Sequence, residues 1–145
     1  MKIRGTAAAY YSNSRNLGGF IEMIKPSAFK QSLKKADVRC LSEHDPQNLL
    51  GRTSSGTLRL QDTKTGLQFE CDLPDTTTAN DLSKLIERGD LRGCSFRMRV
   101  LNSEWDFAGK VPLRIVTEAE IDEITMTATP AYLATDCEVI SDVAV

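Results

Sequence analysis

The residues of this chain best suited to acid–base chemistry are a single histidine and its acidic neighbours. His44 is the only histidine, and Glu43 and Asp45 flank it. Histidine takes up and returns protons near neutral pH, so His44 could act as a general base. The same pattern is also typical of a charged surface loop.

Two adjacent residues are candidate nucleophiles for this base. A serine hydroxyl needs an adjacent base to react, whereas a cysteine reacts as its thiolate. Ser95 and Cys94 lie in the predicted strand 92–101, and Gly93 would let a substrate backbone approach. Because side chains alternate along a strand, Ser95 and Cys94 point to opposite faces. We predict Ser95 in the site and Cys94 in the core as a small hydrophobe, although a serine beside charged residues is often only exposed to solvent.

A base histidine is normally oriented by a third group, often a carboxylate. Three carboxylates are available: Asp45, Asp122 and Glu123. Ile124 and Met126 have a buried character, which by alternation sends Glu123 to the other face of its strand. Acyl transfer also needs a donor to the oxyanion, which would be a backbone N–H or one of three arginines, Arg52, Arg97 and Arg99.

Other site chemistries are not supported by the spacing of residues. The four cysteines form no CxxC pair, and one histidine is too few for a zinc site, so no metal or organic cofactor is expected. Residues 51–56 contain two glycines but no Gly-Lys-Ser/Thr end, which favours a hairpin turn over a phosphate loop. The net charge of -2 argues against a nucleic-acid partner.

Length and composition predict one soluble globular domain over residues 1–145. The chain has 41% hydrophobic and 26% charged residues, with no apolar run long enough to span a membrane. The N-terminus lacks the apolar stretch of a secretory signal, so we expect the protein to stay in the cytosol with reduced cysteines.

The elements that must position these residues are mostly strands. Alternation and turn residues predict strands at 2–9, 19–24, 38–42, 49–53, 58–61, 67–73, 92–101, 111–116 and 121–127. The strand at 38–42 delivers His44, and Pro46 should then stop regular pairing. The three strands between 49 and 73 read as a meander, and the tail after Tyr132 is weakly patterned.

Helices are predicted at only two places. Pro26 suits the first turn of a helix that ends near Ala36. A clearer helix follows residues 74–76 and ends before Gly89, with a buried stripe formed by Ala79, Leu82, Leu85 and Ile86. The predicted fold class is therefore β-rich, a mainly antiparallel β-barrel with two or three flanking helices.

At these residues the sequence resembles the prohead maturation proteases of tailed bacteriophages. The resemblance runs from about Gly5 to Tyr132. It rests on the order and spacing of the stretches 17–22, 24–29, 38–39, 44–46, 50–58, 72–76, 86–90, 92–96, 123–125 and 129–132. The resemblance implies a fold similar to herpesvirus assembly proteases. It also implies that Ser95 and His44 are catalytic, with Glu123 as the third member.

The function implied by the resemblance is serine endopeptidase activity during prohead maturation. The expected partners are the major capsid protein and the scaffold as substrates, with self-cleavage and a possible homo-oligomer, inside the assembling prohead in the host cytoplasm. The rival hypothesis is a catalytically silent capsid-assembly or scaffold-binding module of the same fold. A weaker third interpretation is an esterase or amidase acting on small substrates.

Overall fold

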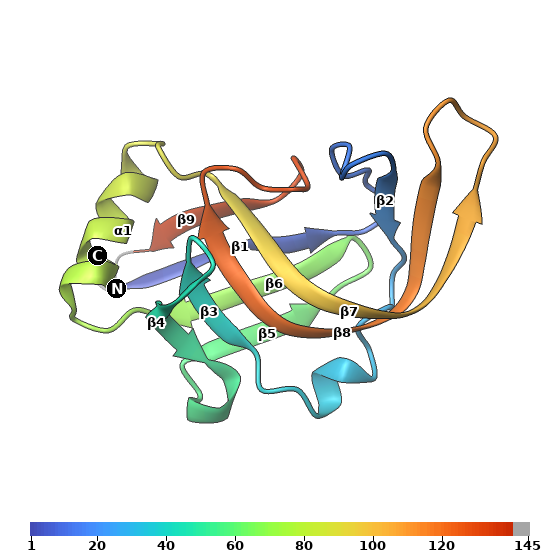
Figure 1. The fold of residues 1–145 in the computed structure, drawn as a ribbon. Helices are drawn as coiled ribbons and strands as arrows, with labels where there is room; N and C mark the ends of the chain where they lie inside the picture. Colours follow the sequence, from blue (N-terminus) through green and yellow to red (C-terminus); the bar gives the residue numbers. More distant parts are fainter. Residues whose placement is uncertain (141–145) are drawn as a thin grey trace.

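The computed structural model describes residues 1–140 as two β-sheets with one α-helix (Figure 1). The strands are β1 (Lys2–Ala9), β2 (Ile21–Ile24), β3 (Arg39–Ser42), β4 (Asp45–Arg52), β5 (Leu58–Asp62), β6 (Gly66–Asp72), β7 (Gly93–Asp106), β8 (Leu113–Thr127) and β9 (Asp136–Ile140). The α-helix is α1 (Thr77–Glu87), and two short 3-10 turns are η1 (Ser32–Lys34) and η2 (Thr53–Ser55).

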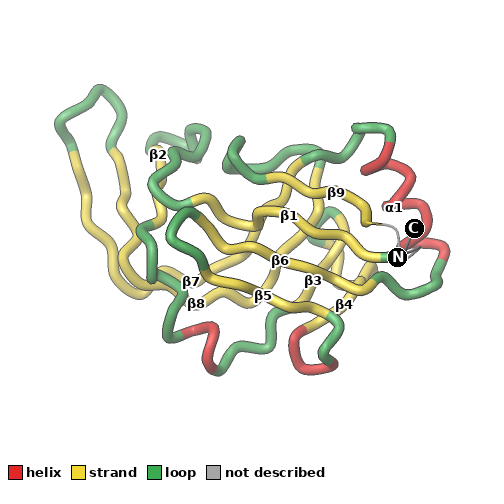
Figure 2. Tube along the Cα trace, turned by 180° about the vertical axis from the view of Figure 1, so that it is seen from behind, coloured by secondary structure: helices red, strands yellow, loops and turns green. Residues whose placement is uncertain are grey.

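Each sheet has its own strand order. The first sheet is antiparallel throughout, in the order β5-β6-β1-β9. The second sheet has the order β2-β8-β3-β4, and β7 also pairs with β8. In this second sheet β2 and β3 run parallel to β8. The prediction of a β-rich fold is confirmed, but the predicted closed barrel is wrong, because the two sheets remain separate (Figure 2). The similarity to herpesvirus assembly proteases stays a prediction.

One cluster of buried apolar side chains takes residues from both sheets. Ile3, Leu67 and Phe69 come from the first sheet, whereas Ile124 and Met126 come from β8. Helix α1 adds three residues of its predicted stripe to this core, and Leu85, the fourth, is instead 38% exposed. The core therefore packs against one face of β8, and the other face is left for polar residues.

The predicted helix over residues 26–36 is wrong. Ser27 has a φ of 71°, in the left-handed region, which interrupts a helix at its first turn. The segment forms successive turns that end in η1, while Phe29 still fills the core. The part of the chain that the structure describes therefore has one α-helix where two or three helices were predicted.

Three further differences concern strands. Pro46 does not stop pairing, because β4 is an edge strand whose register shifts around it, and proline is tolerated at such sites. The predicted meander breaks at η2, since β4 pairs with β3 whereas β5 pairs with β6. The two predicted strands at 111–116 and 121–127 are one strand, β8, and the weakly patterned tail contains β9.

Candidate active site

Strand β8 lies between the two strands that deliver Ser95 and His44. On one side β7 pairs antiparallel with β8, and Ser95 is the cross-strand partner of Thr125. On the other side β3 runs parallel to β8 and ends with Ser42 beside Met126. The chain then turns, so that His44 comes to lie against Thr125. Residues separated by about 50 positions in the sequence therefore lie on either side of the same residue of β8.

The turn that holds His44 has an unusual backbone conformation. Glu43 and His44 have φ values of 51° and 57°, a region that costs a non-glycine residue about 1–3 kcal/mol. Hydrogen bonds offset this cost: the His44 N–H donates to Thr125 Oγ1 at 2.8 Å, and the Glu43 N–H donates to the Met126 carbonyl at 2.9 Å. The Glu43 carboxylate accepts from the Ala128 N–H at 2.7 Å. The turn is thus fixed to the end of β8.

The His44 ring is paired with a buried carboxylate. Its Nδ1 lies 2.6 Å from Glu123 Oε2, and the Glu123 side chain is only 2% exposed, whereas that of His44 is 49% exposed. An ionised carboxylate only accepts hydrogen bonds, so Nδ1 carries the proton in this contact. The tautomer leaves Nε2 as the ring nitrogen with a free lone pair, as a general base requires.

Ser95 is buried, with 7% of its surface exposed. Its Oγ accepts a hydrogen bond from the backbone N–H of Ala131 at 3.2 Å. Within residues 1–140 no hydrogen bond joins the Ser95 hydroxyl to the His44 ring. A Cβ at Gly93 would lie 2.4 Å from Pro130, so the absence of a side chain makes room for Pro130. The approach of a substrate backbone at Gly93 stays a prediction.

Among the described residues, neither alternative third carboxylate forms a hydrogen bond with the His44 ring. Asp122 is exposed and accepts two hydrogen bonds from Arg97, at 3.0 and 3.1 Å. Asp45, the first residue of β4, accepts from the Gln47 N–H at 2.9 Å. Only Glu123 contacts His44 among these three, which follows from the alternation of β8.

The alternative nucleophile is enclosed in the core. Cys94 is fully buried, and burial raises the pKa of its thiol well above the usual value. A thiol that stays protonated is a poor nucleophile. The sequence-based prediction that Cys94 belongs to the core is confirmed.

Sequence reasoning missed two residues that touch the site. Thr125 lies on the same face of β8 as Glu123, as alternation indicated, but its bond to the His44 N–H depends on the pairing of β3 with β8. Ala131 belongs to the segment after β8, for which no strand or helix was predicted. Neither contact leaves a local signal in the sequence.

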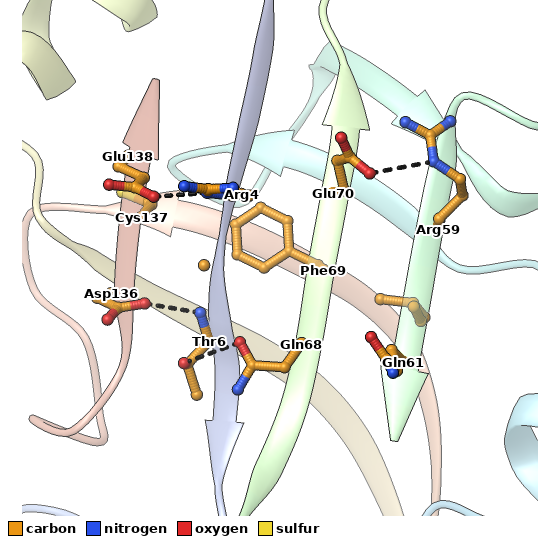
Figure 3. A pocket seen from close by; sticks show the side chains of 12 residues that line it. Arg4, Thr6, Arg59, Gln61, Gln68, Phe69, Glu70, Asp136, Cys137 and Glu138 are labelled. Atoms are coloured by element: carbon orange, nitrogen blue, oxygen red, sulfur yellow. Dashed lines mark hydrogen bonds and ion pairs between the residues drawn. The ribbon is translucent and has the colours of Figure 1, made fainter. Parts of the chain in front are cut away.

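A pocket of about 700 Å³ lies on the first sheet, away from these residues (Figure 3). It is lined from β1, β5, β6 and β9, and two ion pairs lie in its wall, Arg4 with Glu138 at 2.6 Å and Arg59 with Glu70 at 3.5 Å. A smaller pocket of about 330 Å³ lies beside the site, with Gly93 and Pro130 in its wall. Within residues 1–140 no cluster of three or more His, Cys, Asp or Glu side chains could hold a metal ion.

A buried serine, a histidine and a buried carboxylate that contacts the histidine are the residue types used by serine hydrolases, and here Ser95 and His44 both flank Thr125 of β8. The chain belongs to the caudovirus prohead serine protease family, whose model matches residues 1–144. The comparison with curated proteins gives no match. No helix among the described residues has the length and apolar character needed to cross a membrane.

Proposed function

We propose that this protein is a serine endopeptidase that cleaves head proteins during prohead maturation. Membership of the prohead serine protease family gives the class of reaction. The observation that carries the proposal is the 2.6 Å contact between His44 and the buried Glu123 on the strand that also pairs with Ser95. Burial of a carboxylate costs free energy, so a nearly inaccessible carboxylate that contacts a half-exposed imidazole indicates a functional pair.

The roles of the three residues follow from their chemistry. Ser95 Oγ bonds to the carbonyl carbon of a peptide, and its proton passes to His44 Nε2. His44 gives this proton to the leaving amine nitrogen as the C–N bond breaks, which leaves an ester on Ser95. A water molecule, deprotonated by His44, then attacks the ester and restores the serine hydroxyl. Glu123 holds the imidazole in the required tautomer and stabilises its charged form.

Substrates of this reaction would be the proteins that surround the peptidase inside the prohead. We propose the scaffold and the scaffolding part of the major capsid protein, together with the peptidase itself, in the host cytoplasm. Self-association is compatible with cleavage of one copy by another. A fold similar to herpesvirus assembly proteases belongs to the same proposal.

A fluorophosphonate probe tests whether the site is a working serine peptidase. The probe should form one covalent adduct, on Ser95, detected by mass spectrometry of the digested protein. Purified protein should also convert the major capsid protein of its phage to a shorter product. A chain that binds the capsid protein but neither takes the probe nor cleaves would be an assembly module. A chain that takes the probe and hydrolyses only small esters would be an esterase.

A further inference from the structure

The backbone N–H of Ala131 has an unusual acceptor in the side chain of Ser95. The donor nitrogen lies 3.2 Å from Ser95 Oγ, and Ser95 is buried. We propose that this N–H is an oxyanion donor of the peptidase, which stabilises the negative charge that develops on the substrate carbonyl oxygen. This inference rests on the proposed peptidase function. The Ala131 N–H would supply the oxyanion stabilisation that the three side chains of the triad do not supply.

Elimination of other donors supports this assignment. The N–H of Cys94 points away from β8, because it donates to Thr135 Oγ1 at 3.1 Å. Successive N–H groups of a strand point in opposite directions, so the N–H of Ser95 faces β8 and belongs to the sheet. The nucleophile's own amide, a frequent oxyanion donor, is therefore not free to bind a substrate oxygen.

The arginines considered from the sequence are also engaged elsewhere. Each of them forms an ion pair with a carboxylate other than Glu123: Arg97 with Asp122, Arg99 with Glu120, and Arg52 with Asp37. These pairs lie on the exposed surface, whereas Ser95 is buried. A guanidinium would have to leave its partner and move toward the site before it could stabilise the oxyanion.

The segment around Ala131 is held in place on both sides of its N–H. The Ala131 carbonyl accepts from the Arg15 N–H at 2.8 Å. The Tyr132 ring stacks on Phe96 with centroids 5.4 Å apart, and its hydroxyl donates to the buried Glu22 at 2.6 Å. Donors that are fixed before the reaction need no reorganisation when charge develops, which is the condition for strong oxyanion stabilisation.

The direction of the hydrogen bond from the Ala131 N–H to Ser95 Oγ is compatible with the proposed reaction. Because Ser95 Oγ accepts from this N–H, the serine proton stays free to be donated to His44. When Oγ bonds to the carbonyl carbon, the carbonyl oxygen gains the negative charge on the same carbon, two bonds away from Oγ. A small shift then brings the Ala131 N–H from Oγ to this oxygen, and the N–H returns to Oγ when the ester is hydrolysed.

A backbone ester tests the proposal without changing any side chain. The natural Gly93–Cys94 junction allows a thioester of residues 1–93 to be ligated to a synthetic segment 94–145. Replacement of Ala131 by lactic acid in that segment exchanges its N–H for an oxygen. We expect kcat for peptide cleavage to fall about 10²- to 10³-fold with KM little changed, the usual effect of removing one oxyanion donor.

The matched control is an ester at Leu133, which is exposed and whose N–H has no acceptor among the described residues. This control should keep kcat within about threefold of the all-amide synthetic chain. An Ala131 ester that keeps the kcat of the all-amide synthetic chain would overturn the proposal. An equal fall of kcat in the Ala131 ester and the Leu133 ester would also overturn it, because the effect would then be structural.

A second measurement follows the N–H itself. In a chain labelled with ¹⁵N-alanine, formation of the fluorophosphonate adduct should move the Ala131 amide proton downfield, as the N–H binds the phosphonyl oxygen. An adduct that leaves this resonance unchanged would contradict the oxyanion role. A native chain that takes no probe and cleaves nothing would overturn the peptidase function as well, which separates the two failures.

Discussion

The two ends of the β7–β8 ribbon differ in their contact with water. We call residues 93–97 with 123–127 the base of the ribbon, and residues 102–106 with 113–118 its arm. The pairing is continuous in the base, whereas the register shifts between Asn102 and Ser103 in the arm. All of residues 123–127 are buried, whereas all of residues 102–106 are exposed. Residues 113–116 of the arm pair with β2, and the end of the hairpin extends at the outer edge of the molecule (Figures 1 and 2).

The same kinds of side chain behave differently in these two regions. In the arm, Trp105 is 44% exposed and stacks on Phe107, and Asn102 donates to Glu118 at the surface. In the base, Glu123 is buried and contacts His44. Charge interactions are much stronger where water is excluded, so a carboxylate in this buried part of the ribbon can orient a histidine that accepts protons. The candidate catalytic residues of the ribbon lie where β3 and the segment 128–135 cover it.

The largest expected effect comes from Ser95→Ala in the base. This variant should lower the rate of capsid-protein cleavage by about 10⁴-fold or more, because no nucleophile remains. The measurement is cleavage followed by gel electrophoresis or mass spectrometry. Ser103→Ala, on the exposed arm of the same strand, is the control and should cleave at the native rate. Native activity in Ser95→Ala would show that Ser95 is not the nucleophile, and the base would then have no chemical role that the arm lacks.

Glu123→Gln should have the second largest effect. We expect kcat to fall about 10³- to 10⁴-fold, because a neutral amide neither fixes the His44 tautomer nor stabilises its charged form. The neighbouring Asp122→Asn removes only an exposed pair with Arg97, which is worth about 0–1 kcal/mol, and should leave kcat unchanged. Equal losses in the two variants would show that the burial of Glu123 is not what matters.

Thr125→Val should produce an intermediate loss. The valine keeps the shape of the buried side chain but leaves the His44 N–H without its acceptor, which should cost about 1–3 kcal/mol in the free energy of unfolding. A displaced ring should also lower kcat by about 10- to 100-fold. Steady-state kinetics and urea unfolding measure the two effects. Thr117→Val, in the arm, serves as the reference and should change neither quantity.

The smallest effect is expected for Trp105→Ala in the arm. Trp105 stacks on Phe107 and meets Phe20 at a centroid distance of 5.6 Å, while the Arg114 guanidinium lies 5.9 Å from its ring. Loss of these contacts should lower the free energy of unfolding by about 1 kcal/mol. Cleavage of a short peptide should stay at the native rate. A loss of peptide cleavage comparable with that of Thr125→Val would show that the arm and the base act together.

Local patterns in the sequence determined the elements and the faces of the site. Alternation along β7 placed Cys94 in the core, and alternation along β8 placed Glu123 opposite Ile124 and Met126. Residues 74–76 and Gly89 marked the ends of α1, and in the structure the Thr76 side chain caps its first turn. These features follow from the period of side chains along a strand or helix, which needs no knowledge of distant residues.

Only the tertiary structure decided which of these faces meet. A period of two tells which residues share a face, but it does not identify the neighbouring strand. The parallel pairing of β3 with β8 brings His44 to Glu123, and the segment after β8 brings the Ala131 N–H to Ser95. These pairings depend on the packing of a common core between distant segments, so residue types and spacing predicted the chemistry of the site but not its geometry.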